Sequence, residues 1–233
     1  MTSTHAQLAY QHLRSRLIAG EFQPGSRIRY GPIGQQLGIS ATPVREAMGL
    51  LANEGFVELV PQLGAVVRTI GRDELVELYE MREAIEPYAA AKAAERASPA
   101  QLDAIQRALG RMRSIAAKVA KTKSRTAGKC DTAEFEKADL GFHMLIIDAT
   151  GNQTMVRSSE SSNALVRVFS ADRHAYDATI MEATCDDHAS ILDAIRSGDA
   201  ARARDAMQRH IASGLQLTLQ EIESRETNRW EVP

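Results

Sequence analysis

The chain has 233 residues, of which 44% are hydrophobic and 25% are charged, and its formal net charge is −2. This composition is typical of a globular protein with one large or two modest domains, and it argues against a wholly basic nucleic-acid coat protein. The two cysteines lack the spacing of a zinc site or a disulfide framework. The N-terminus lacks a signal-peptide core and no apolar run approaches ~18 residues, so we expect a cytoplasmic protein with no membrane partner.

The first 70 residues have the pattern of three helices followed by a short hairpin. Apolar residues at helical spacing fill residues 4–22 and 30–40, and a third helix is expected with Thr42 as its N-cap. Residues 56–70 alternate apolar and polar side chains around a break at "PQLG", which predicts a two-stranded wing. The region is mildly basic, with six Lys/Arg against four Asp/Glu. We therefore predict a winged helix-turn-helix domain over residues 1–71.

From Arg72 onward the pattern is almost entirely helical, so the chain as a whole is expected to be mainly α. Breaks at "ASPA", "TAGKCD", "ATGN" and "RSGD" separate the expected helices. These helices are expected near residues 72–97, 99–121, 132–149, 152–176, 178–197 and 199–224. The pattern predicts an all-helical bundle over residues 72–226, followed by a C-terminal tail over residues 227–233.

Four ionisable residues interrupt the apolar faces of three of these helices. In "DLGFHMLIID", Asp139 and His143 lie one helical turn apart among aromatic and aliphatic residues, and His188 and His210 lie on the apolar faces of the last two helices. An unpaired buried carboxylate costs several kcal/mol, so it needs a partner. One carboxylate and three imidazoles suit a first-row transition metal ion. Taken singly, each residue could instead be a hydrogen-bonded structural residue.

Arg82 interrupts the apolar face of the first helix after residue 71. A guanidinium in such a place suits a carboxylate ligand. The alternative is an internal pair, either with Glu86 one turn further along or with an acid of another helix. In the fourth helix, Ser159, Ser162 and Asn163 fall on successive turns, where they could line a cavity or simply lie on the surface.

Five stretches of the chain resemble the GntR superfamily of bacterial transcription regulators. They are "LIAGEFQPGSRI", "LGISATPVREAMGLLANEGFVELVPQLGAVV", "LYEMREAIEP", "ADLGFHMLIIDATGN" and "DDHASILDAIRSGDAARARDAMQRHI". The similarity is to the FadR-type branch, in which the C-terminal part is a helical FCD effector domain. It implies a winged-helix DNA-binding domain, a six- or seven-helix effector domain and a homodimer. It also implies a metal site at Asp139, His143, His188 and His210, with a small organic acid bound beside the metal and Arg82 as a contributor.

The same resemblance identifies residues for DNA binding. Arg45 is at the front of the recognition helix, where side chains reach base edges in the major groove, although it could instead contact a phosphate or its own helix. Five further residues are expected at backbone phosphates, which fix the register without reading sequence. These are Arg27, Arg29, Ser40, Thr42 and Arg68. The chain departs from the family at Ala41, which replaces an arginine, and at Leu63, where the wing often carries one.

These observations predict a DNA-binding transcription regulator rather than an enzyme, with double-stranded operator DNA as its partner. The metal is expected to be a divalent transition ion such as zinc, nickel or manganese. Because a bound cation and Arg82 would both attract an anion, the effector is expected to be a small carboxylate. Asn163 and the nearby serines would then select among acids. The alternatives are a metal-dependent enzyme and a sensor of the metal itself, both using the Asp/His3 site.

Overall fold

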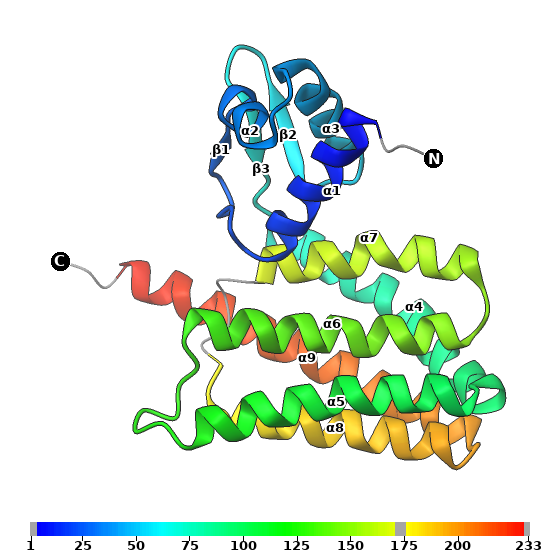
Figure 1. Cartoon of the computed structure of the whole chain (residues 1–233). Helices are drawn as coiled ribbons and strands as arrows, with labels where there is room; N and C mark the ends of the chain where they lie inside the picture. The colour runs from blue at the N-terminus through cyan, green and yellow to red at the C-terminus, as the bar shows by residue number, and fades with distance from the viewer. Residues whose placement is uncertain (1–3, 171–175, 231–233) are drawn as a thin grey trace. The chain divides into compact units, whose positions relative to one another are not determined.

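The computed structural model describes residues 4–170 and 176–230 (Figure 1). The chain is mainly helical and divides after Gly71 into two compact units, which we describe one at a time. The first contains three helices and a small three-stranded sheet, and the second contains six helices. This architecture confirms the predicted winged helix-turn-helix followed by a helical bundle.

The first unit is built on a helical core. Its helices are α1 (His5–Ile18), α2 (Tyr30–Leu37) and α3 (Ala41–Asn53). Thr4 and Gln7 form a capping box, in which each side chain accepts a hydrogen bond from the other residue's backbone N–H, and this fixes the start of α1. α1 packs against α3 through side chains that are fully buried. These side chains are Ala9, Leu13 and Leu17 of α1, and Val44, Ala47, Met48 and Leu51 of α3.

The third helix begins earlier than the sequence pattern predicts. The residue in the N-cap position is Ser40, whose backbone is extended, so the prediction that Thr42 caps this helix was wrong. Thr42 and Pro43 both lie within the first turn. Proline is tolerated there because the first backbone N–H groups of a helix have no partner within the helix. The consequence is that Thr42 is free to face outward, and its side chain is exposed.

The wing has one strand more than predicted. Its strands are β1 (Arg27–Ile28), β2 (Val57–Val60) and β3 (Gly64–Val67), in the antiparallel order β1-β3-β2. Gly64 begins β3 with a φ of 101°, and a Cβ at this position would lie 3.0 Å from the carbonyl oxygen of Ile28. Glycine therefore allows the close approach of β1 to β3 at the turn end of the wing.

The second unit is a bundle of six helices, as the pattern predicted. They are α4 (Arg72–Arg96), α5 (Pro99–Ala120), α6 (Lys129–Ala149), α7 (Gln153–Ser170), α8 (Ala178–Arg196) and α9 (Ala200–Trp230). α6 begins three residues before its predicted start, and α9 continues past its predicted end at residue 224. α7 was predicted to reach residue 176, but residues 171–175 lie outside the described part of the chain, as do residues 231–233.

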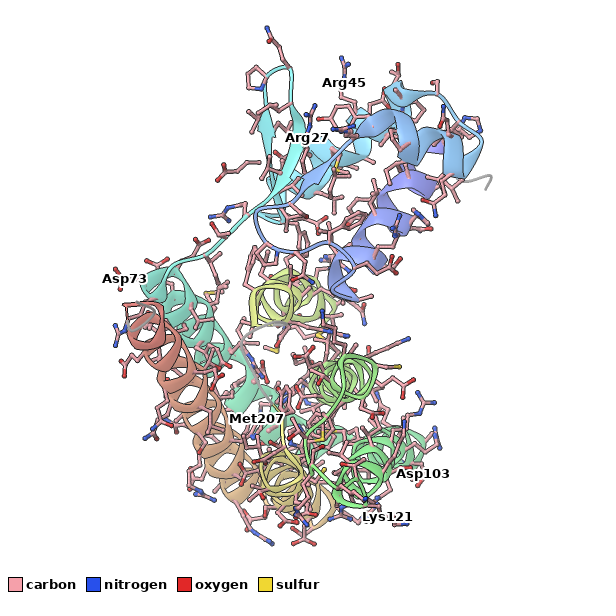
Figure 2. The ribbon with its side chains drawn as sticks, turned by 90° about the vertical axis from the view of Figure 1, so that its left-hand side faces the viewer. Arg27, Arg45, Asp73, Asp103, Lys121 and Met207 are labelled. Atoms are coloured by element: carbon pink, nitrogen blue, oxygen red, sulfur yellow. The ribbon has the colours of Figure 1, made fainter. Side chains whose placement is uncertain are left out.

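The bundle places four helices around a common interior. Figures 1 and 2 both show α5, α6 and α8 running nearly side by side, whereas α4 and α9 cross them obliquely. α4 packs along α9 and also contacts α6 and α8, and α8 in turn packs against α9. Side chains on the inner faces of α4, α6, α8 and α9 therefore meet. Among the described helices, none has both the length and the apolar content needed to cross a lipid bilayer.

Candidate functional sites

Four ionisable residues meet inside the bundle. Asp139 and His143 come from one face of α6, His188 comes from α8 and His210 from α9, and one ligand atom of each lies within 4.8 Å of the others. The structure thus brings together all four residues that the sequence suggested as metal ligands. His143 and His188 are buried, whereas the Asp139 side chain is 31% exposed. The exposed side of the cluster gives an ion or a ligand a route to it.

Each of the three imidazole rings is held by its outer nitrogen. In every case Nδ1 faces an oxygen acceptor, so Nδ1 carries the proton and donates it. The acceptors are Glu86 Oε2 for His143 at 2.6 Å, the carbonyl oxygen of Thr184 for His188 at 2.7 Å, and Asp187 Oδ2 for His210 at 3.4 Å. A ring that carries its single proton on Nδ1 presents the lone pair of Nε2 to the centre of the cluster.

The inner atoms of the cluster lie close enough together to share one cation. Asp139 Oδ1 lies 3.0 Å from His188 Nε2, and His143 Nε2 lies 3.3 Å from His210 Nε2. Within the described part of the chain, the buried His188 Nε2 forms no hydrogen bond of good geometry. In rings protonated only at Nδ1, the inner Nε2 lone pairs face one another and Asp139, and a divalent ion accepts electron density from all of them. The four residues therefore fit a transition metal ion.

The protonation states also suit metal binding. Burial would raise the pKa of Asp139, but His188, and then His143 and His210, outweigh this effect and lower its pKa below the ordinary value, so the carboxylate is ionised. For His210, burial and the neighbouring His188 lower the pKa to about 4. The His210 ring is therefore neutral near pH 7, and no proton has to leave its Nε2 before a metal ion binds.

Arg82 and Glu86 of α4 lie against this cluster. Glu86 is fully buried, and its Oε1 accepts a hydrogen bond from Arg82 Nε at 2.8 Å. Burial would raise the pKa of Glu86, but Arg82 and His143 hold it well below its usual range. The internal pair that the sequence offered as an alternative is thus formed, yet Arg82 Nη2 still lies 3.5 Å from His143 Nε2. Arg82 can therefore pair with Glu86 and face the cluster at the same time.

The polar residues of α7 are buried, so the idea that they lie on the surface was wrong. Ser159, Ser162 and Asn163 are at most 8% exposed. Asn163 Nδ2 donates to the Ser159 carbonyl oxygen at 3.1 Å, and Ser162 Oγ donates to the same oxygen at 3.2 Å. The amide oxygen of Asn163 is not used by either bond. A role for Asn163 in effector binding stays a prediction.

Sequence reasoning missed the residues that hold the outer ring nitrogens. Glu86 was considered only as a partner for Arg82, and neither Thr184 nor Asp187 was singled out. The usable signal was a second ionisable residue on the core face of α4, one turn after Arg82. A buried cation and a buried anion neutralise each other, and the second carboxylate oxygen is then free for a histidine.

In the first unit, three of the four arginines suggested for DNA contact line a hollow between the wing and the two helices α2 and α3. The hollow has a volume of about 620 Å³, and its lining includes Arg27, Arg29 and Arg45 with the ring of Tyr30. The Arg45 guanidinium lies 5.9 Å from the centroid of that ring. Figure 2 shows Arg45 projecting away from α3 and Arg27 beside the wing. All three arginines are exposed.

The remaining residues suggested for DNA contact differ in their exposure and in the contacts that they make within the protein. Ser40 and Thr42 are exposed at the start of α3. Arg68 is partly buried, its Nη1 donates to the carbonyl oxygen of Gly55 at 3.1 Å, and its Nε is 3.9 Å from Glu58 Oε1. Arg68 therefore also stabilises the base of the wing, and Arg27 stabilises its turn by donating to the carbonyl oxygen of Leu63.

Comparison with known proteins supports both parts of this description. Residues 5–67 match the family of bacterial regulatory proteins known as the gntR family, and residues 77–213 match the FCD domain. The chain is 29% identical over 203 residues to a probable D-xylose utilization operon transcriptional repressor of Paenarthrobacter nicotinovorans, covering 87% of this chain and 83% of that one. It is 26% identical over 214 residues to the regulator LutR of Bacillus subtilis, covering 83% and 92%.

A solved structure shows the same fold. E. coli McbR/YncC superposes with a TM-score of 0.79 at 19% sequence identity, covering 95% of this chain and 100% of that one. The matches to the two domains fall in the same order as the two units described here, and the similar proteins are regulators rather than enzymes. The chain therefore belongs to the GntR family of bacterial transcription regulators, with an N-terminal helix-turn-helix DNA-binding domain followed by a helical FCD domain.

Proposed function

We propose that this regulator changes its affinity for double-stranded operator DNA when a small organic acid binds at a metal site in the helical unit. The observation that carries the proposal is the convergence of Asp139, His143, His188 and His210 with Arg82 beside them. The four side chains would bind a divalent ion such as zinc, nickel or manganese. This ion would offer an open coordination position to an anionic oxygen. A cation and a guanidinium at one site select a negatively charged ligand.

Arg82 and Asn163 would contact different groups of that ligand. The Nε of Arg82 is used by Glu86, and its Nη2 lies 3.5 Å from His143 Nε2, so the guanidinium offers its Nη groups to a carboxylate on the side of the cluster. Asn163 would contribute its amide oxygen and thereby distinguish hydroxylated acids from plain ones. An acid that binds two conformations of the protein unequally shifts their populations by no more than its differential affinity. DNA affinity responds to the acid if one of those conformations binds the operator better.

Replacing Arg82 with alanine should remove most of the response to the acid. With metal saturating, we expect one member of a panel of dicarboxylates, tricarboxylates and sugar acids to raise the Tm of the wild type. Loss of a charged hydrogen-bonding group costs about 1.5–3 kcal/mol, so the acid should bind Arg82→Ala about 10- to 100-fold more weakly. Thermal shift against acid concentration measures this. Arg107→Ala, which changes an exposed arginine of α5, is the control.

Arg82→Gln should be measured as well, because glutamine keeps a donor for the buried Glu86 and protects the fold. An acid that stabilises Arg82→Gln and the wild type equally would show that Arg82 only supports Glu86. A neutral compound as the best ligand would contradict the carboxylate proposal. Titrating operator affinity first with metal alone and then with acids tests the alternative, since a full response to metal alone would make the ion itself the signal.

For DNA, we propose a homodimer that presents two recognition helices to a roughly palindromic site. The supporting observation is the group of exposed side chains around the start of α3 and the wing. Arg45 would read base edges. The residues proposed for phosphate contacts are Arg27, Arg29, Ser40, Thr42 and Arg68. Ala41 and Leu63 are exposed in the same region and contribute no charge.

Changing Ala41 to arginine should tighten DNA binding. Position 41 is the first residue of α3 and is exposed, so a cation there can reach a phosphate without disturbing the core. Each added phosphate contact steepens the dependence of log K on log salt by about 0.9. Fluorescence anisotropy at several salt concentrations would measure the slope. Ser190→Arg, an exposed site on α8, serves as the control, and an equal slope in both variants would contradict a contact at position 41.

A further inference from the structure

The carboxylate of Glu86 accepts hydrogen bonds from two residues that have different roles in the site. Its Oε2 accepts from His143 Nδ1 at 2.6 Å, and its Oε1 accepts from Arg82 Nε at 2.8 Å. The side chain is fully buried, so these two contacts compete little with water. One partner is a residue of the metal cluster, and the other is the arginine proposed to hold the acid.

We propose that Glu86 is a positioning residue that sets the balance between metal binding and anion binding in this site. The inference rests on the proposed function, and it adds a residue that neither touches the metal nor contacts the acid. Glu86 acts on the metal through His143 and on the acid through Arg82. Its negative charge affects these two ligands in opposite directions.

The effect on the metal follows from the hydrogen bond to His143. A carboxylate at Nδ1 fixes the ring orientation, keeps the Nε2 lone pair directed at the cluster and makes that nitrogen a stronger donor. The same charge offsets Arg82, whose Nη2 is only 3.5 Å from His143 Nε2 and would otherwise repel a cation bound there. Both effects strengthen metal binding.

The effect on an acid has the opposite sign. Arg82 is already paired with an anion, so its attraction for a second carboxylate is reduced. Removing the charge of Glu86 while keeping its shape should therefore lower the affinity for the metal and raise the affinity for the anion. If Glu86 merely stabilised the bundle, changing it would lower the affinity for both ligands together. The two affinities therefore distinguish a structural role from a positioning role.

The test compares Glu86→Gln with Glu83→Gln, an identical charge change at an exposed position of α4 that hydrogen-bonds Gln208. Nickel affinity is measured by competition with a chelator, and acetate binding by the Tm shift of the nickel-loaded protein. We expect Glu86→Gln to bind nickel about 10- to 100-fold more weakly than the wild type and to show the larger acetate shift. Glu83→Gln should match the wild type in both.

Unchanged nickel affinity in Glu86→Gln, or an acetate shift equal to or smaller than that of the wild type, would overturn the inference. If Glu86→Gln does not fold because Arg82 is left unpaired, the double variant Arg82→Gln/Glu86→Gln removes both charges. It must still bind nickel more weakly than Arg82→Gln alone. Failure of the wild type to bind nickel at all would instead refute the proposed metal site, which keeps the two failures distinguishable.

Discussion

Replacing His188 with alanine should remove the metal from the protein and abolish the thermal stabilisation that the metal provides. His188 is fully buried, its Nδ1 is held by the Thr184 carbonyl oxygen, and its Nε2 faces Asp139 Oδ1 at 3.0 Å. The remaining three ligands come from only two helices, α6 and α9, so the ion would no longer tie α8 to them.

The size of the effect follows from mass action. A ligand at 100 times its Kd stabilises the native state by about 2.7 kcal/mol. For a chain of this size, that corresponds to a Tm about 5–10 °C higher. The informative quantity is the Tm difference between metal-loaded and chelator-treated protein, because alanine also leaves a cavity in the metal-free bundle. We expect this difference in the wild type and none in His188→Ala.

Elemental analysis of the purified proteins gives an independent measure. The wild type should contain close to one ion per chain, and His188→Ala should contain far less. His5→Ala, which changes an exposed histidine at the start of α1, is the matched control and should retain the metal. Full metal content in His188→Ala would refute the assignment of the site.

The parts of the fold that could be predicted are those with a long repeating pattern. In α5, the buried residues Ile105, Leu109, Met112, Ala116 and Val119 recur at the spacing of one helical face. That signal continues for about four turns and does not depend on any contact outside the helix. The third strand of the wing could not be predicted in this way. β1 has two residues, which is too short for an alternating pattern, and it exists because β3 offers it a partner.

The metal ligands could be predicted for a similar reason, and their outer contacts could not. Asp139 and His143 share a face because they are four residues apart on one helix, whatever the rest of the chain does. The contact of His143 with Glu86 joins residues 57 positions apart and depends on how α4 packs against α6. Spacing along one helix cannot indicate which of several acids will meet a ring from another helix.

Changing Arg45 to alanine should lower affinity for the preferred operator much more than affinity for bulk DNA. Arg45 is exposed in the second turn of α3, and its guanidinium lies near the Tyr30 ring, which limits its motion. A bidentate arginine contact to the N7 and O6 of guanine contributes about 1–3 kcal/mol of discrimination against the wrong base. We therefore expect the ratio of specific to non-specific affinity to fall about 5- to 150-fold.

The matched control is Arg29→Ala, which removes an exposed arginine from the same hollow but at a position proposed to contact phosphate. A phosphate contact carries no base information, so this variant should lower the affinity for operator and for bulk DNA by the same factor. The slope of log K against log salt should become shallower by about 0.9. Selection from a randomised DNA pool first defines the operator, and anisotropy titrations then compare the three proteins on it. Equal losses on operator and bulk DNA in Arg45→Ala would place Arg45 at the backbone as well, and base reading would then have to come from other side chains of α3 or from DNA shape.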